Sequence, residues 1–240
     1  MNIDKVLIID FGSQVTKLIA RRVRELGVYS EILNINHLKN IKKLESVKGI
    51  ILSGGPASVT QKKYPKISKE IFLKKIPILG ICYGLQLISK SFGGKVKNNK
   101  KKREFGRAKL FEKKKSVLTK NFFDKKITNV WMSHQDAVTN LPKGFNKIAS
   151  TKNSALTIIE NKNLNIYGIQ FHPEITHTQN GKILFYNFLY HICKIKKKWK
   201  IGSQKKRLID LIKKKVKGNK VICALSGGVD SSVSALLINK

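Results

Sequence analysis

Short apolar segments alternate with amphipathic segments along the first part of the chain. Four segments that contain apolar residues have the length of β-strands: Val6–Ile9, Tyr29–Ile35, Gly49–Leu52 and Ile76–Ile81. After the first of them, residues 14–26 carry apolar side chains three and four positions apart, which is the spacing of one helix face. Strands that alternate with helices predict an α/β fold with a doubly wound, mostly parallel sheet.

The pattern changes after residue 95. From there to about Phe171 the apolar pieces are shorter and rich in turn residues, which favours antiparallel strands. Gly181–Cys193 is predicted to form a closing helix, and a short basic linker follows it. A second amphipathic helix is expected at Gln204–Val216, ahead of a short apolar strand at Val221–Leu225. A domain boundary is therefore expected between residues 196 and 197.

One cysteine occupies a position that is typical of a nucleophile. The fourth apolar run ends in Gly80-Ile81-Cys82-Tyr83-Gly84, and helical spacing begins directly afterwards. A sharp strand-to-helix turn of this kind exposes its central residue, and the glycines keep Cβ atoms out of the turn. The positive end of the helix dipole also favours a thiolate. Cys82 is therefore a candidate nucleophile; the alternative is a small buried core residue, the usual fate of a free cysteine.

A histidine and a carboxylate follow another apolar run. Residues 166–171 are predicted to form a strand that delivers His172, Pro173 and Glu174 at its end. Histidine can accept the proton of a thiol and return it to a leaving amine, and a nearby carboxylate can orient the imidazole. On its own this tripeptide would be a surface turn. Together with the cysteine it predicts a Cys82–His172–Glu174 triad.

A glycine-rich turn is the candidate oxyanion site. The apolar run at residues 49–52 leads into Ser53-Gly54-Gly55-Pro56. A glycine turn at a strand end can direct a backbone N–H toward a developing oxyanion. The predicted donors are the N–H groups of Gly55 and of Tyr83, the residue after the nucleophile. Without the other motifs, this segment would be an ordinary loop.

Three of these motifs together resemble those of class I glutamine amidotransferases: ILSGGP at 51–56, GICYGLQ at 80–86 and FHPE at 171–174. The resemblance implies hydrolysis of the side-chain amide of glutamine through a cysteine thioester, with release of ammonia. Further segments are similar to the branch of this family found in GMP synthetases: IDFGSQ at 9–14, RRVRELGVY at 21–29, REFG at 103–106, WMSH at 131–134 and QFHPEITHT at 170–178. The amidotransferase domain is accordingly expected over residues 3–196.

The resemblance also assigns residues to the glutamine pocket. Gln86 lies one helical turn after the nucleophile, and Ser133, His134 and Asp136 lie at a predicted strand end; all four are expected to contact the bound glutamine. The chain departs from the family at Gln135, where the usual residue is glycine. A side chain there is expected to crowd the pocket or change the approach of the backbone.

A candidate phosphate-binding loop lies near the C-terminus. The segment Ser-Gly-Gly-Val-Asp-Ser-Ser stands between an apolar run and an apolar helix, and such N–H groups and hydroxyls at a helix N-terminus form an anion nest. It lacks the Gly-Lys-Ser/Thr ending of a Walker loop. It resembles the pyrophosphate-binding loop of the N-type ATP pyrophosphatases, so residues 197–240 are expected to begin such a domain. The residues expected to bind ATP are Ser226, Gly227, Gly228, Val229, Asp230, Ser231 and Ser232.

The resemblance implies particular partners. In GMP synthetases, ATP and Mg²⁺ adenylate xanthosine monophosphate in the second domain, and ammonia from glutamine then yields GMP. Neither a prosthetic group nor a resident metal is expected. Because residues 197–240 supply only a truncated α/β unit, the remaining pyrophosphatase and dimerisation portion is expected in the same or a separate chain. A homodimer is expected only with that portion, and this chain alone is expected at most to hydrolyse glutamine.

Charge and composition leave two interpretations of the surface. The chain has 49 Lys and Arg against 14 Asp and Glu, a formal net charge of +35, and a dense basic surface attracts nucleic acid. Small lysine clusters lie at 100–102, 113–115, 196–198 and 213–215. They are not interleaved with aromatic residues, which favours compositional drift over specific nucleic-acid binding. Three scattered cysteines, no signal peptide and no apolar run of about 18 residues predict a cytoplasmic protein.

Two other functions fit the same sequence. The chain could belong to a different synthase as its amidotransferase component, but the C-terminal loop argues against this. It could also be an inactive amidotransferase fold that serves as a scaffold, an alternative that Gln135 and the truncated second unit keep open. The intact Cys82–His172–Glu174 set favours the enzyme.

Overall fold

The computed structural model describes residues 3–35, 44, 46–98, 103–196, 199 and 201–240, and it divides the chain into two compact units, 1–197 and 198–240. The lysine cluster at 100–102 and most of the cluster at 196–198 lie outside the described residues. Each unit is considered by itself below.

A nine-stranded sheet in the order β2-β1-β3-β4-β11-β10-β9-β6-β7 forms the centre of the first unit. The first five of these strands pair in parallel, as the alternation of strands and helices predicted. They are β1 (Lys5–Asp10), β2 (Tyr29–Asn34), β3 (Val47–Leu52), β4 (Ile78–Ile81) and β11 (Ile166–Ile169).

The remaining strands are antiparallel, which confirms the expectation for the region after residue 95. They extend the sheet on the β11 side: β6 (Glu104–Glu112), β7 (Ile127–His134), β9 (Asn146–Ser150) and β10 (Ile158–Asn161). A separate two-stranded sheet pairs β5 (Lys95–Asn98) with β8 (Asp136–Asn140).

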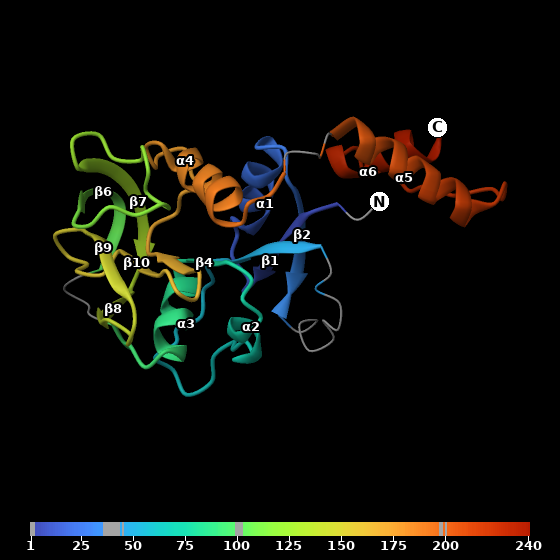
Figure 1. The fold of residues 1–240 in the computed structure, drawn as a ribbon. Helices are drawn as coiled ribbons and strands as arrows, with labels where there is room; N and C mark the ends of the chain where they lie inside the picture. The colour runs from blue at the N-terminus through green and yellow to red at the C-terminus, as the bar shows by residue number, and fades with distance from the viewer. Residues whose placement is uncertain (1–2, 36–43, 45, 99–102, 197–198, 200) are drawn as a thin grey trace. The chain divides into compact units, whose positions relative to one another are not determined.

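Helices cover both faces of the sheet (Figure 1). One face carries α1 (Thr16–Glu25) and α4 (Gly181–Tyr186), which continues as a π-helical segment, Asn187–Ile192. The opposite face carries α2 (Glu70–Leu73) and α3 (Tyr83–Ser91). The two faces give two buried apolar clusters, one beneath α1 and α4 and the other beneath α2 and α3. This double layer is the doubly wound arrangement that the sequence predicted.

The second unit contains α5 (Ile201–Val216) and α6 (Val229–Ile238). The predicted strand at Val221–Leu225 is wrong, because these residues have no regular structure and Ile222 is 99% exposed. A strand requires a hydrogen-bonded neighbour, and no strand occurs in the described part of this unit. Among the described residues of the whole chain, no helix is long and apolar enough to cross a membrane.

The sheet order places the main motifs at one edge. Strands β3, β4 and β11 are parallel neighbours, with Leu52 opposite Gly80 and Ile81 opposite Ile169. Their carboxyl ends therefore meet at the same edge of the sheet, where open α/β folds bind their ligands. The glycine turn, Cys82 and the segment that carries His172 each begin at one of these ends.

Candidate active site

Cys82 stands between the last residue of β4 and the first residue of α3, with φ +52° and ψ −103°. A positive φ is unusual for a residue with a side chain and costs of order 1–3 kcal/mol. The surrounding structure maintains it, since the Cys82 N–H donates to the carbonyl of Ile169 at 2.8 Å. The predicted strand-to-helix elbow is therefore present, and it is strained at the candidate nucleophile.

Two glycines allow the elbow to pack against the sheet. A Cβ on Gly84 would lie 2.4 Å from the carbonyl oxygen of Leu52, and a Cβ on Gly80 would lie 2.5 Å from the carbonyl carbon of Gly84. Atoms cannot approach so closely, so the start of α3 reaches β3 and β4 only because these positions have no side chain. The same contact holds Cys82 at the edge where β3 and β11 end.

The predicted triad residues come together at this edge. The Nδ1 atom of His172 lies 2.8 Å from Oε1 of Glu174, whose side chain is fully buried. A Cβ on Gly54 would lie 3.2 Å from Cε1 of His172 and 3.7 Å from Cβ of Cys82, so the glycine turn passes directly beside both residues. The fold thus brings a candidate nucleophile next to a candidate base and its candidate orienting carboxylate, from two segments that are distant in the sequence.

Two side chains that sequence reasoning missed fix the histidine segment. Thr178 donates a hydrogen bond from Oγ1 to the carbonyl of His172 at 2.7 Å and accepts one from the N–H of Trp131 at 3.0 Å. Arg22 on α1 donates from Nε to the carbonyl of Glu174 at 3.1 Å. Both residues lie inside family-like motifs, but the contact of Thr178 with Trp131 and that of Arg22 with Glu174 join segments that are far apart in the sequence and could not be identified from it.

The electrostatics of the site favour a charged imidazole. Burial lowers the pKa of His172, but hydrogen bonds with Cys82 and Glu174, and the negative charge on both partners, outweigh burial and raise the pKa to about 10. At neutral pH the imidazole is therefore protonated beside the sulfur. A neighbouring cation favours the thiolate, which is the nucleophilic form of cysteine.

Replacing Glu174 with glutamine is expected to lower the pKa of His172, because the carboxylate charge that supports the imidazolium is lost. In the unchanged protein, the stability contributed by protonated His172 is full below its unfolded pKa of about 6.5 and is lost as the pH rises through about 10. Imidazole ¹⁵N NMR titration of both proteins, with urea unfolding at pH 6, 8 and 10, measures the effect. An unchanged titration of His172 in E174Q contradicts this assignment of the carboxylate.

The candidate oxyanion donors lie on the two segments that flank Cys82. Tyr83 is the first residue of α3, and the N–H groups of a first helical turn have no partner within the helix. The glycine turn is tied to the end of β1, since the N–H of Phe11 donates to Oγ of Ser53 at 3.1 Å and a Cβ on Gly55 would lie 2.6 Å from the Phe11 carbonyl oxygen. The roles of Gly55 and Tyr83 as donors remain predictions.

The four residues assigned to the glutamine pocket occupy different environments. Gln86 is buried and donates from Nε2 to the carbonyl of Asp136 at 2.8 Å. The carbonyl of Ser133 accepts a long hydrogen bond, 3.7 Å, from the thiol of Cys82. His134 is buried with Nε2 3.1 Å from Oε2 of Glu104.

The fourth pocket residue, Asp136, is buried with both carboxylate oxygens in use. It accepts from the hydroxyl of Ser58 and, at 2.9 Å, from the amide of Asn98. Neither neighbour was identified from the sequence. Gln135, where the family usually has glycine, is exposed to solvent. Contact of Gln86, Ser133, His134 and Asp136 with glutamine remains a prediction.

The predicted ATP loop lies in the second unit, at the start of α6. Gly227 has a positive φ of +79°, and the hydroxyls of Ser231 and Ser232 donate to the carbonyl of Gly228 at 2.9 and 3.0 Å. These two hydrogen bonds tie the hydroxyls of the loop to the N-terminus of α6. ATP binding by residues 226–232 remains a prediction.

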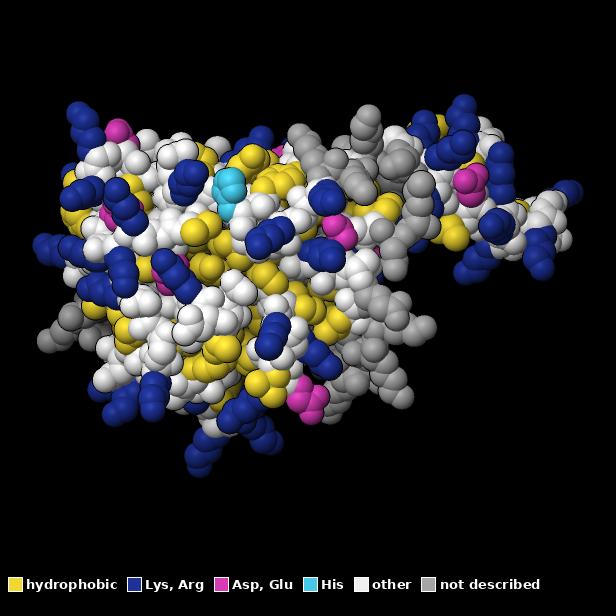
Figure 2. All heavy atoms as spheres, viewed as in Figure 1, with side chains coloured by type: hydrophobic (Ala, Val, Ile, Leu, Met, Phe, Trp, Pro, Cys, Tyr) yellow, Lys and Arg dark blue, Asp and Glu magenta, His cyan; other side chains and the backbone are white. Residues whose placement is uncertain are grey.

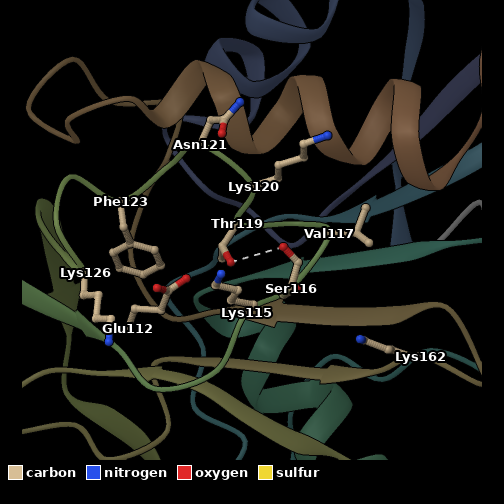
Figure 3. Close-up of a pocket in the computed structure, with 10 residues that line it drawn as sticks. All are labelled: Glu112, Lys115, Ser116, Val117, Thr119, Lys120, Asn121, Phe123, Lys126 and Lys162. Atoms are coloured by element: carbon tan, nitrogen blue, oxygen red, sulfur yellow. Dashed lines mark hydrogen bonds between the residues drawn. The ribbon is translucent and has the colours of Figure 1, made fainter.

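A cavity of about 530 Å³ lies away from the triad (Figure 3). Its lining includes Lys115, Lys120, Lys126 and Lys162, with the carboxylate of Glu112 among them. None of the predicted site residues lines it.

Figure 2 shows Lys and Arg side chains scattered over the visible face instead of gathered in one patch, which agrees with compositional drift.

Comparison with known proteins supplies the family. The family described as "Glutamine amidotransferase class-I" matches residues 7–192, a range that includes every motif of the triad. The chain belongs to the class I glutamine amidotransferases. Within this amidotransferase the matched range covers the complete nine-stranded sheet except the first residues of β1.

Sequence relatives of this amidotransferase are longer proteins. It is 51% identical over 243 residues to the GMP synthase [glutamine-hydrolyzing] of Brachyspira hyodysenteriae and 49% identical over 236 residues to that of Aquifex aeolicus. These alignments include 100% and 98% of this chain but 46% of each relative. The chain therefore spans less than half the length of the curated relatives it matches.

Solved structures agree with the fold. A Thermoplasma acidophilum protein described as a GMP synthase subunit is 30% identical, with a TM-score of 0.68 over 80% of this chain and 94% of that one. A glutamine amidotransferase from Thermotoga maritima is 20% identical, with a TM-score of 0.63 over 100% of this chain and 90% of that one. At that lower identity the similarity shows the fold alone.

Proposed function

We propose that the first unit hydrolyses the side-chain amide of glutamine to glutamate and ammonia. The observation that supports this most directly is the meeting of Cys82, His172 and Glu174 at the carboxyl ends of β4 and β11, beside the glycine turn after β3. The set contains a nucleophile, an acid–base group and its orienting carboxylate.

The reaction uses the thiolate–imidazolium pair. The Cys82 thiolate attacks the amide carbon of glutamine, and the N–H groups of Gly55 and Tyr83 stabilise the oxyanion. His172 donates its proton to the leaving nitrogen, the C–N bond breaks, and ammonia leaves a γ-glutamyl thioester on Cys82. His172 then takes a proton from water as the water attacks the thioester. The C–S bond breaks, glutamate leaves, and the thiolate beside a protonated His172 is restored.

We further propose that this chain is the glutaminase half of a GMP synthetase. Its relatives at 51% and 49% identity are glutamine-hydrolysing GMP synthases of roughly twice its length. In the complete enzyme, ATP with Mg²⁺ would bind at residues 226–232 and adenylate xanthosine monophosphate, which ammonia then converts to GMP. Homodimerisation would require the remaining portion. Three unpaired cysteines agree with a reducing, cytoplasmic location.

The surface of the second unit supports a missing portion. Ile222 and Leu225, which precede the predicted ATP loop, and Val229, which lies in it, are 99%, 62% and 79% exposed. Large apolar side chains grouped on a surface mark an interaction site. Because the alignment takes in all of this chain but 46% of the relative, we propose that the remaining part of the pyrophosphatase domain covers these side chains.

Adding the separately produced C-terminal half of the Brachyspira hyodysenteriae relative is expected to give GMP from glutamine, ATP, Mg²⁺ and xanthosine monophosphate. Chromatographic measurement of GMP tests this result. The matched control is Cys82→Ala, which should stop glutamine-dependent synthesis while synthesis from added ammonium continues. If the unchanged chain releases ammonia but never supports GMP formation, the synthetase assignment is wrong and the glutaminase assignment stands.

A further inference from the structure

One buried side chain touches the candidate nucleophile without belonging to the predicted triad. Gln170 is fully buried, and its Nε2 lies 3.8 Å from Sγ of Cys82, within reach of a hydrogen bond to sulfur. Its Oε1 is also buried and has no hydrogen-bond partner among the described residues. The contact with sulfur is therefore the one hydrogen bond in which this amide side chain takes part within the described structure.

The backbone holds Gln170 at this position. Gln170 directly follows the last residue of β11, and a Cβ on Gly168 in that strand would lie 2.3 Å from Cδ1 of Leu85. This glycine lets α3 pack directly on β11, so the first residue before α3, Cys82, comes level with the strand end. The N–H of Gln170 donates to the carbonyl of Thr157 at 2.9 Å, which fixes the residue from the other side.

Two polar groups in contact with the sulfur have opposite effects on it. The Ser133 carbonyl accepts from the thiol and therefore favours the protonated form. The Gln170 amide donates, and a donor favours the anion, to which hydrogen bonds are stronger. The titratable group beside the sulfur is His172, with Glu174 behind it; the Tyr83 hydroxyl instead donates to the carbonyl of Pro65.

We infer that Gln170 donates a hydrogen bond to the Cys82 thiolate and, together with His172, holds the nucleophile in its reactive form. An amide that served only packing would leave both of its ends unsatisfied in the interior, which is unfavourable. The amide N–H of Gln170 is a neutral donor, so it stabilises the thiolate in addition to the His172 imidazolium and takes no proton from either group. The inference rests on Cys82 being the nucleophile of the proposed function.

The pH dependence of Cys82 alkylation by iodoacetamide tests this role without requiring glutamine turnover. Peptide mass spectrometry measures the rate at Cys82 in a Cys223→Ser background, because Cys223 is exposed. Gln170→Met keeps the size of the side chain and removes the donor. The expected result is a rise of about one pH unit in the midpoint of alkylation, with a rate at pH 7 about 3- to 10-fold lower.

Asn187→Leu is the matched control, since Asn187 is also a buried amide but donates to the carbonyls of Leu118 and Lys120. This variant should lose stability and keep the alkylation midpoint. If Gln170→Met does not fold, Gln170→Glu, which is also close in size, should raise the midpoint by more because it places a second acid at the sulfur. A folded Gln170 variant with an unchanged or lower midpoint overturns the inference; loss of glutamine hydrolysis with the expected shift would leave it intact.

Discussion

Glutamine hydrolysis is expected to fall at least about 1,000-fold when Cys82 is replaced by alanine, because the thioester route then has no nucleophile. The protein should stay folded, since the contacts of the sulfur with the Ser133 carbonyl and the Gln170 amide are long, 3.7 and 3.8 Å, and Cys82 is a small side chain. Ammonia release measured with a coupled glutamate dehydrogenase assay gives the activity, and thermal unfolding gives the stability.

Cys223→Ala is the matched control for this experiment. Cys223 is the exposed cysteine and lies in the second unit, so its loss should leave hydrolysis and stability unchanged. Cys82→Gly is a second test that removes the thiol and also relieves the backbone strain, because glycine adopts the positive φ of this elbow without strain. It should be as inactive as the alanine variant and no less stable. Residual hydrolysis close to that of the unchanged chain in either Cys82 variant contradicts the assignment.

A methyl group at Gly84 is expected to lower both the stability of the first unit and the rate of glutamine hydrolysis. The Cβ of Gly84→Ala would lie 2.4 Å from the carbonyl oxygen of Leu52 and 2.8 Å from its Cβ. Backbone cannot yield as a flexible side chain can, so α3 must move away from β3. Overpacking of this kind costs about 1–3 kcal/mol, and hydrolysis should also fall because the elbow at Cys82 moves with the helix.

Urea unfolding of the first unit and ammonia release measure the two effects of Gly84→Ala. Gly202→Ala is the control, because a Cβ at Gly202, in the first turn of α5, meets no atom within 4 Å. That change should be neutral or slightly stabilising, since alanine has the higher helix propensity. Equal unfolding midpoints for Gly84→Ala and the unchanged protein would show that the tight α3–β3 contact is not needed.

Local sequence patterns predict much of the parallel half of the fold. A buried parallel strand is a short apolar run, and a glycine-bounded cysteine at its end followed by helical spacing predicts the elbow. The order β3-β4-β11 follows from no local pattern, because β11 is separated from β4 by the whole antiparallel region. The resemblance to amidotransferases supplied that juxtaposition, and the structure then brought Cys82 and His172 together.

Other features depend on tertiary contacts that periodicity cannot reveal. The closing helix was predicted at residues 181–193, but it changes to π-helical geometry at Asn187, whose side chain bonds two loop carbonyls. The predicted strand at 221–225 is absent because an apolar run forms a strand only with a neighbour. Gln170 looked like an ordinary residue at a strand end, and only the position of the sulfur in space gave it a chemical role.

The central claim is that this fold uses Cys82 to form a thioester with glutamine. Acid quenching of the chain during glutamine turnover, followed by peptide mass spectrometry, tests it most directly. The account predicts a γ-glutamyl adduct on the peptide that contains Cys82 and none on the peptides that contain Cys193 or Cys223. Ammonia release without an adduct at Cys82, or with an adduct at another residue, would contradict it.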